Sequence, residues 1–202
     1  MIINNEDKKL DLGRILGGIA WPGDNKPGFA VVVGADKFPK IGGRIHHHHL
    51  LAEVEDNDTG QLLKKCAELK ARFEVDNFYG RYDESITNFL TFWNRDARDR
   101  HVPEFHVYPA PVSEDGKIGY HLNLLRERLQ SAKKTLHLLG QSRLPGYLSE
   151  LPANGTATLT DSQYPALAAL GYAVATLIFY GPDLDEDEEY YPRHDIDPIT
   201  GY

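Results

Sequence analysis

The feature that most constrains the fold is an unbroken apolar run, FAVVVGA, from Phe29 to Ala35. A continuous β-branched run without charged residues is typical of a strand that is buried on both faces. Segments rich in proline and glycine flank the run at Pro22–Gly28 and Pro39–Gly43, and they predict turns. The run therefore predicts a strand in the interior of a sheet.

Two further segments predict strands on either side of this run. RILGGIAW, from Arg14 to Trp21, precedes it, and Arg44–Val54 follows it. Because only short turns separate the three segments, we expect an antiparallel meander.

After the meander, helix and strand signals alternate. An apolar stripe at helical spacing predicts a crossover helix over Thr59–Phe73, and Asn77–Arg81 predicts a short strand parallel to its neighbour. A second helix is expected from Ser85, and a fifth strand over Glu104–Tyr108. Apolar spacing then predicts a series of helices, over Leu122–Leu139, around Tyr147 and from Asp161 onward.

This order of elements resembles the ribonuclease H arrangement, an α/β fold with a mixed five-stranded sheet flanked by helices. The length of 202 residues suits one domain. We expect a loose N-terminal segment over 1–12, the ribonuclease H-like domain over 13–180, and an acidic irregular tail over 181–202.

Charge and cysteine content limit the classes of function. The formal net charge of −8 weakens any case for tight DNA binding, which normally needs a basic surface. Six acids fall between Asp183 and Glu189, a run that predicts a solvated tail, with a DNA-mimicking or metal-collecting segment as the alternative. The single cysteine, Cys66, and the absence of a signal-like start predict a cytoplasmic protein. No apolar run is long enough to cross a bilayer.

Acidic residues at the ends of the predicted elements are the candidates for chemistry. Asp83 and Glu84 follow the fourth strand, and Asp161 precedes the last helix. Carboxylates on separate elements can hold Mg²⁺ or Mn²⁺ ions, which activate water for hydrolysis of a phosphodiester. Each aspartate also has a structural interpretation, because both lie where a helix begins and aspartate is a favoured N-cap.

Three segments of this chain resemble the nuclease domain of the phage terminase large subunit. They are GGIAWPG, YGRYDESITNFL and DSQYPALAALGYA, and the resemblance spans about Gly13 to Phe179. It implies metal-dependent DNA hydrolysis, with Asp83 and Asp161 as catalytic metal ligands. No G-x-x-x-x-G-K-[ST] loop occurs, so we expect neither the ATPase half nor nucleotide binding.

One departure from the resemblance concerns the first strand, where the family has a metal-binding aspartate. Aligning the hairpins places Ala20 or Trp21 at that position, and neither is a metal ligand. Asp24, in the following turn, is one candidate substitute, and a shifted register makes Asp36 the other. The sequence therefore predicts an incomplete carboxylate site.

Four consecutive histidines, His46 to His49, form a second candidate metal site. Because side chains alternate along a strand, at most two of them share a face. Two beside Glu53 or Glu55 could bind a transition metal, but a half-buried polar face is the favoured interpretation.

Two hypotheses for the function follow. The first is a phage- or prophage-derived nuclease-like protein that uses Mg²⁺ or Mn²⁺ to cut DNA. The second is a catalytically lost ribonuclease H-like fold that acts as a binding or assembly module, with phage packaging proteins as its partners. An unrelated α/β protein with the same order of elements is a third alternative.

Overall fold

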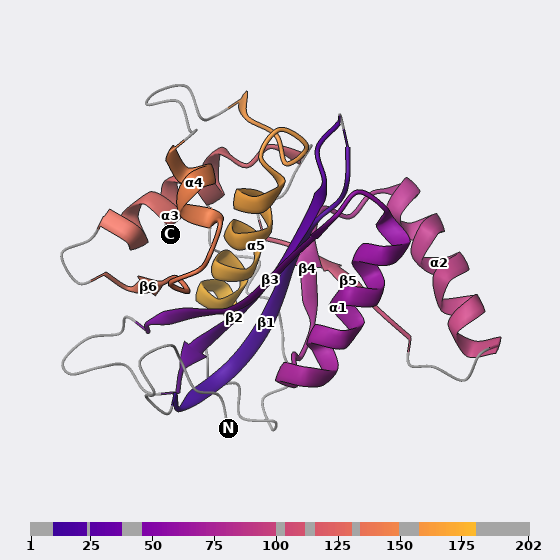
Figure 1. The fold of residues 1–202 in the computed structure, drawn as a ribbon, viewed down its shortest axis with the longest axis horizontal. Coiled ribbons are helices and arrows are strands. Elements are labelled where there is room, and N and C mark those ends of the chain that lie inside the picture. Colours follow the sequence, from indigo (N-terminus) through magenta and orange to yellow (C-terminus); the bar gives the residue numbers. More distant parts are fainter. Residues whose placement is uncertain are drawn as a thin grey trace, which may run out of the picture.

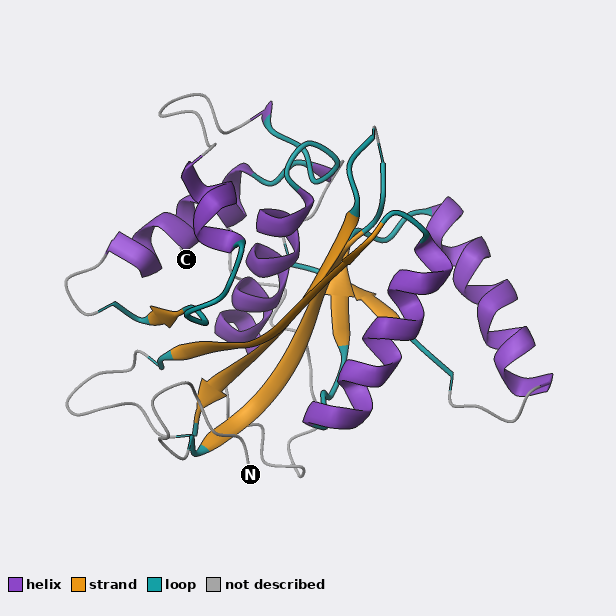
Figure 2. Ribbon diagram, viewed as in Figure 1, coloured by secondary structure: helices purple, strands orange, loops and turns teal. Residues whose placement is uncertain are grey.

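The computed structural model describes residues 10–23, 25–37, 46–99, 104–111, 116–130, 134–149 and 158–180. Within these ranges the protein is a mixed six-stranded sheet with helices on both faces (Figure 2). The predicted α/β architecture, a mixed sheet flanked by helices, is confirmed, with six strands where five were expected.

Three long strands form the predicted antiparallel meander: β1 (Leu12–Ala20), β2 (Gly28–Asp36) and β3 (His48–Asp56). β2 lies between the other two, and all of its residues are buried. Its unbroken apolar sequence suits this position, because helices cover both faces of the sheet (Figure 1).

Three short parallel strands complete the sheet in the order β5-β4-β1-β2-β3-β6. β4 (Phe78–Gly80) pairs with β1, and β5 (Val107–Pro109) pairs with β4 and forms one edge. β6 (Leu136–His137) pairs with β3 and forms the opposite edge. The parallel pairing of β4 with β1 brings the carboxyl ends of these two strands together.

The helix predicted over Leu122–Leu139 is wrong in its second half. The helix α3 (Gly119–Gln130) ends earlier, and Leu136 belongs to the edge strand β6. The backbone N–H of His48 donates to the carbonyl of Thr135 at 2.8 Å. Leu136 therefore pairs with the edge of β3 as a strand residue, although the spacing of the leucines is that of a helix.

One face of the sheet is covered by α1 (Thr59–Phe73) and α2 (Glu84–Asp99) (Figure 1). The Asp58 carboxylate accepts a hydrogen bond from the Gln61 N–H and caps the start of α1. Leu62, Leu69 and Cys66 are buried on the sheet, while Phe73 is partly buried against the same core. Cys66 is a core residue, and its burial raises the pKa of the thiol.

The other face is covered by α3, α4 (Leu144–Ser149) and α5 (Pro165–Tyr180) (Figure 1). α5 is buried along most of its length and packs on β1 and β2. Small residues allow this close approach, since a Cβ atom on Gly18 would lie 1.9 Å from the carbonyl oxygen of Ala169. A Cβ atom on Gly23 would lie 3.6 Å from the Cβ atom of Ser162, an ordinary van der Waals contact, so the segment before α5 lies beside the turn after β1.

Several sequence predictions concern residues that the structure does not describe. These are the turn at Pro39–Gly43, the acidic tail over 181–202, Asp24, and residues 1–9 of the N-terminal segment. Among the described residues, none of the helices combines the length and the apolar character needed to span a membrane.

Candidate functional site

The guanidinium of Arg81 lies between the two aspartates that the sequence identifies as candidate ligands. Its Nη1 atom is 3.1 Å from Oδ1 of Asp161, and its Nε atom is 3.2 Å from Oδ2 of Asp83. Arg81 follows β4 directly, Asp83 precedes α2, and Asp161 precedes α5. The fold therefore brings Asp83 and Asp161 to a common point, and a protein cation occupies that point.

Asp161 is the buried member of this site, with 3% of its surface exposed. Its backbone N–H donates to the Gly116 carbonyl at 2.9 Å, and the hydroxyl of Tyr172 donates to Oδ2 at 3.3 Å. Burial raises the pKa of the Asp161 carboxyl above its ordinary value, and the positive charge of Arg81 opposes this shift. Arg81 and Tyr172 therefore offset the free-energy cost of burying the Asp161 carboxylate.

Gly116, three residues before α3, lies against this ion pair. Its φ of 68° lies in the left-handed region, which glycine adopts without strain. A Cβ atom at this position would lie 3.0 Å from both the Arg81 Nη1 and the Asp161 Oδ1 atoms. A glycine at position 116 therefore avoids a steric clash with the side chains of Arg81 and Asp161.

Asp83 makes two contacts, one as a helix cap and one as an ion-pair partner of Arg81. One carboxylate oxygen accepts a hydrogen bond from the Ile86 N–H at 3.0 Å and so caps α2. The other oxygen pairs with Arg81, and 41% of the side chain is exposed. Asp83 is therefore the solvent-facing carboxylate of the site.

The end of β1 contributes no carboxylate to this site. Ala20 and Trp21 are both buried there, at the position where the resemblance placed the missing aspartate. The indole N–H of Trp21 donates to the backbone carbonyl of Arg81 at 3.1 Å. Trp21 therefore holds the backbone of Arg81 in place, and sequence reasoning did not foresee this contact.

Asp36 lies at the opposite end of the sheet. The register pairs it with Leu12 at the start of β1, whereas Ala20 at the other end pairs with Phe29. A strand rises about 3.3 Å per residue, so roughly 26 Å separates the two ends of β1. Asp36 accepts a hydrogen bond from Nε2 of His49 at 2.9 Å and does not converge with Asp83 and Asp161.

These residues do not fit a two-cation centre. Such a centre needs anionic ligands that converge on two ions about 3.5–4 Å apart. Here two carboxylates converge on the side chain of Arg81, and the neighbouring strand end supplies Ala20 and Trp21. Across the described ranges, no group of three or more histidine, cysteine, aspartate or glutamate side chains is placed to hold a metal ion.

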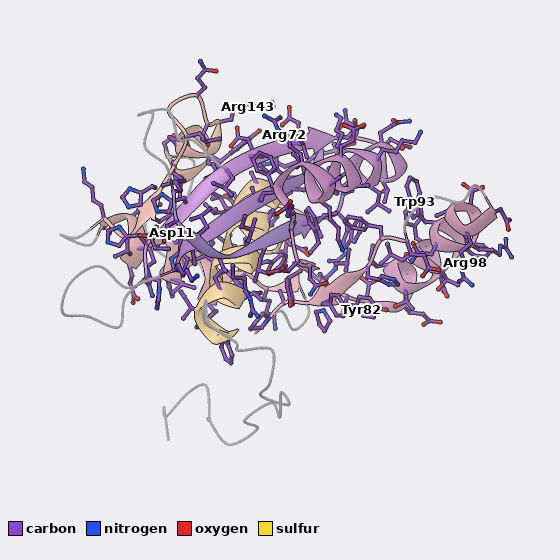
Figure 3. All side chains as sticks on the ribbon, turned by 90° about the horizontal axis from the view of Figure 1, so that it is seen from below. Asp11, Arg72, Tyr82, Trp93, Arg98 and Arg143 are labelled. Atoms are coloured by element: carbon purple, nitrogen blue, oxygen red, sulfur yellow. The ribbon has the colours of Figure 1, made fainter. Side chains whose placement is uncertain are left out.

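Beside the ion pair, Tyr82 is exposed between Arg81 and Asp83. It lines a hollow of about 220 Å³ between α2 and the strand β5, and Figure 3 shows it on the same side of the molecule as Arg98. The other lining residues mix polar, charged and apolar side chains: Thr87, Leu90, Thr91, Asn94, Arg98, Glu104, His106 and Val107.

Glu53 and Glu55, the acids considered as companions of the histidines, lie elsewhere. Glu53 accepts hydrogen bonds from the Ser142 hydroxyl at 2.7 Å and from the Arg143 N–H at 2.8 Å, and Glu55 pairs with the Arg143 guanidinium. Both carboxylates therefore hold the start of α4 against β3. Figure 3 shows Arg143 at the opposite end of the molecule from Arg98.

Comparisons with known proteins support the fold. No protein-family model matches the chain, and no curated protein matches it. Among solved structures, the crystal structure of the large terminase nuclease domain from bacteriophage SPP1 with bound Mn is similar, with a TM-score of 0.52 and 15% identity. The similarity covers 85% of this chain and 90% of the SPP1 domain. The chain therefore has a terminase nuclease-like fold of the ribonuclease H-like α/β class.

Proposed function

We propose that this protein is a terminase nuclease-like module that binds a phage packaging protein and does not itself hydrolyse DNA. The observation that carries the proposal is the position of Arg81 between Asp83 and Asp161. The proposed partner follows from the terminase nuclease-like fold, since terminase domains act in DNA packaging.

Arg81 supplies the positive charge that the two carboxylates need, but it cannot supply the chemistry of a divalent ion. A guanidinium has no open coordination position for water and stays protonated at all ordinary pH values. The buried carboxylate of Asp161 is already satisfied by Arg81 and Tyr172. The site is therefore suited to holding the ends of β4, α2 and α5 together.

The charge of the chain favours a protein partner over DNA. The formal net charge of −8 repels a phosphate backbone. Aromatic and arginine side chains are enriched at protein interfaces. Three aromatic side chains are exposed on the elements that adjoin the site, after β4, on α2 and in β5: Tyr82, Phe92 and Tyr108.

A second candidate function, metal-dependent DNA hydrolysis, is favoured by the convergence of Asp83 and Asp161 from separate elements. The similar SPP1 domain was crystallised with Mn, and a divalent ion is the cofactor that this function needs. Hydrolysis would require Arg81 to leave the two carboxylates when an ion enters, because its guanidinium lies between them. The Arg81 side chain is 34% exposed.

A plasmid-cleavage assay with the full chain separates the two functions. In buffer with Mn²⁺ or Mg²⁺, we expect no conversion of supercoiled plasmid above that of an Asp83→Ala/Asp161→Asn double variant. Cleavage by the wild-type chain that the double variant lacks would overturn the proposal in favour of the nuclease. A gel-shift assay at low salt provides the second readout, in which we expect no retardation of duplex DNA.

A further inference from the structure

Three histidines from two strands meet at the β6 edge of the sheet, far from Arg81. His47 immediately precedes β3, and His49 lies within it on the same side. His137 is the second residue of β6 and pairs with His49 in the parallel register. The two-residue strand β6 thus brings a histidine from a distant segment beside the histidine run.

The nearest ring nitrogens in this group belong to His47 and His137. The Nδ1 atom of His47 lies 2.7 Å from the Nε2 atom of His137, and the two ring planes differ by 15°. One of the two nitrogens therefore holds a proton, and the other directs its lone pair at that proton. His49 lies 4.7 Å from His137 between ring centroids, but its Nε2 atom is bound to Asp36.

We propose that His47 and His137 form a binding site for a divalent transition-metal ion of the zinc class, which takes the place of the shared proton. Neutral imidazole is a preferred ligand of these ions. Because only this pair of nitrogens is assigned, water fills the remaining coordination positions. This proposal is independent of the proposed function, since the histidine pair lies at the β6 edge of the sheet and Arg81 follows β4, near the opposite edge.

The geometry requires only a small adjustment for an ion to enter. A zinc–nitrogen bond measures about 2.0–2.1 Å, so two nitrogens on one tetrahedral ion lie about 3.3 Å apart. The pair must therefore widen by roughly 0.6 Å from its present 2.7 Å. The His137 side chain is exposed, and it belongs to the two-residue strand β6 at the edge of the sheet.

The contact between His49 and Asp36 supports the site without supplying a ligand. Both side chains are largely buried, and their 2.9 Å hydrogen bond fixes the His49 ring beside the His137 ring. His48 points to the other face of the strand and is 2% exposed, so it cannot reach an ion held by His47. The structure therefore assigns His47 as the ligand from the run and His137 as the ligand from β6.

Isothermal titration of the full chain with ZnCl₂ tests the assignment. We expect one ion per chain, with binding weakened by roughly tenfold or more in each of the variants His47→Gln and His137→Gln, which corresponds to about 1.4 kcal/mol. The matched control is His106→Gln, an exposed histidine on the opposite edge, which should bind zinc as the wild type does. Because metal displaces a proton, binding should also weaken as the pH is lowered.

Imidazole resonances in an NMR titration provide the second readout. Zinc should shift the ring signals of His47 and His137 first and leave those of His106 in place. Unchanged zinc affinity in the His47→Gln/His137→Gln double variant would overturn the proposal, as would loss of binding in His46→Gln alone. Absence of zinc binding in the wild-type chain would overturn it as well. Both substituted positions are at the surface, so circular dichroism is expected to confirm that the variants fold.

Discussion

The Nη1 atom of Arg81 lies 3.1 Å from Oδ1 of Asp161, although 80 residues separate them in the sequence. The carboxylate is buried, and the guanidinium reaches it from the end of β4. This pair joins the sheet to the beginning of α5, and it determines both the stability of the site and its chemistry.

Removing the charge of Arg81 should destabilise the fold. In Arg81→Met, the buried carboxylate of Asp161 loses its main compensating charge, and we expect a loss of about 1–3 kcal/mol in the free energy of unfolding. Urea denaturation at neutral pH measures it. The control is Arg72→Met on the exposed side of α1, where the change should stay within about 0.5 kcal/mol. Equal effects of the two substitutions would contradict a special role for Arg81.

The pH dependence of stability should reveal Asp161. Burial raises its pKa above the ordinary 3.8, so the folded state keeps a proton that the unfolded state has released. The stabilising contribution of the protonated carboxyl is therefore complete below pH 3.8 and is lost as the pH rises through the raised pKa. In Asp161→Asn this loss cannot occur, so the stability of the variant relative to wild type should increase with pH. A constant difference between the two denaturation series would show that the Asp161 carboxyl is not perturbed.

His48 should make the protein sensitive to acid. Burial, together with the positive charge of Arg128 and the neighbouring histidines His46, His47 and His49, lowers the pKa of His48 from 6.5 to about 3. Below pH 6.5 the unfolded chain therefore binds a proton that the folded chain does not, and stability falls as the pH falls toward 3.

The expected slope is about 1.4 kcal/mol per pH unit for this group. His121, whose pKa burial lowers to about 4, adds a second contribution of the same sign. Denaturation of His48→Leu between pH 7 and 4 should show a shallower slope than the wild type.

Gly18→Ala should displace α5 from the sheet. Its new Cβ atom would lie 1.9 Å from the Ala169 carbonyl oxygen, which is a backbone atom and cannot rotate away. We expect a loss of about 3 kcal/mol in the free energy of unfolding. Gly146→Ala is the matched control, because nothing lies within 4 Å of its Cβ position and it sits in the helix α4. That substitution should be neutral or slightly stabilising, and thermal unfolding of both variants checks the contrast.

The fold could be predicted because its signals are local. The apolar run from Phe29 and the short turns around it require a meander, and the stripe of α1 identifies the crossover helix. The strand β6 could not be predicted, since two residues carry no periodic signal and Leu136 continues the spacing of a helix. Its pairing depends on the exposed edge of β3, which only the assembled sheet provides.

In the candidate sites too, some residues could be predicted from the sequence and others could not. Asp83 and Asp161 stand out because each is an acid at the end of a predicted element. Arg81 carries no such signal, because an arginine is not a metal ligand, although it stands two residues before Asp83. The partnership of His47 with His137 could not be found from the histidine run, since His137 lies in a segment whose spacing predicts a helix.

The close packing of Gly18 against Ala169 has a consequence for the order of folding. The meander and α1 can form from neighbouring segments, but α5 packs on β1 across most of the described chain. Contacts of such long sequence separation are slow to form, because loop-closure entropy is lost before they stabilise the chain. We therefore expect Arg81 to remain solvated during synthesis until α5 packs on β1 and β2. Formation of its ion pair with Asp161 would then mark the final step of folding.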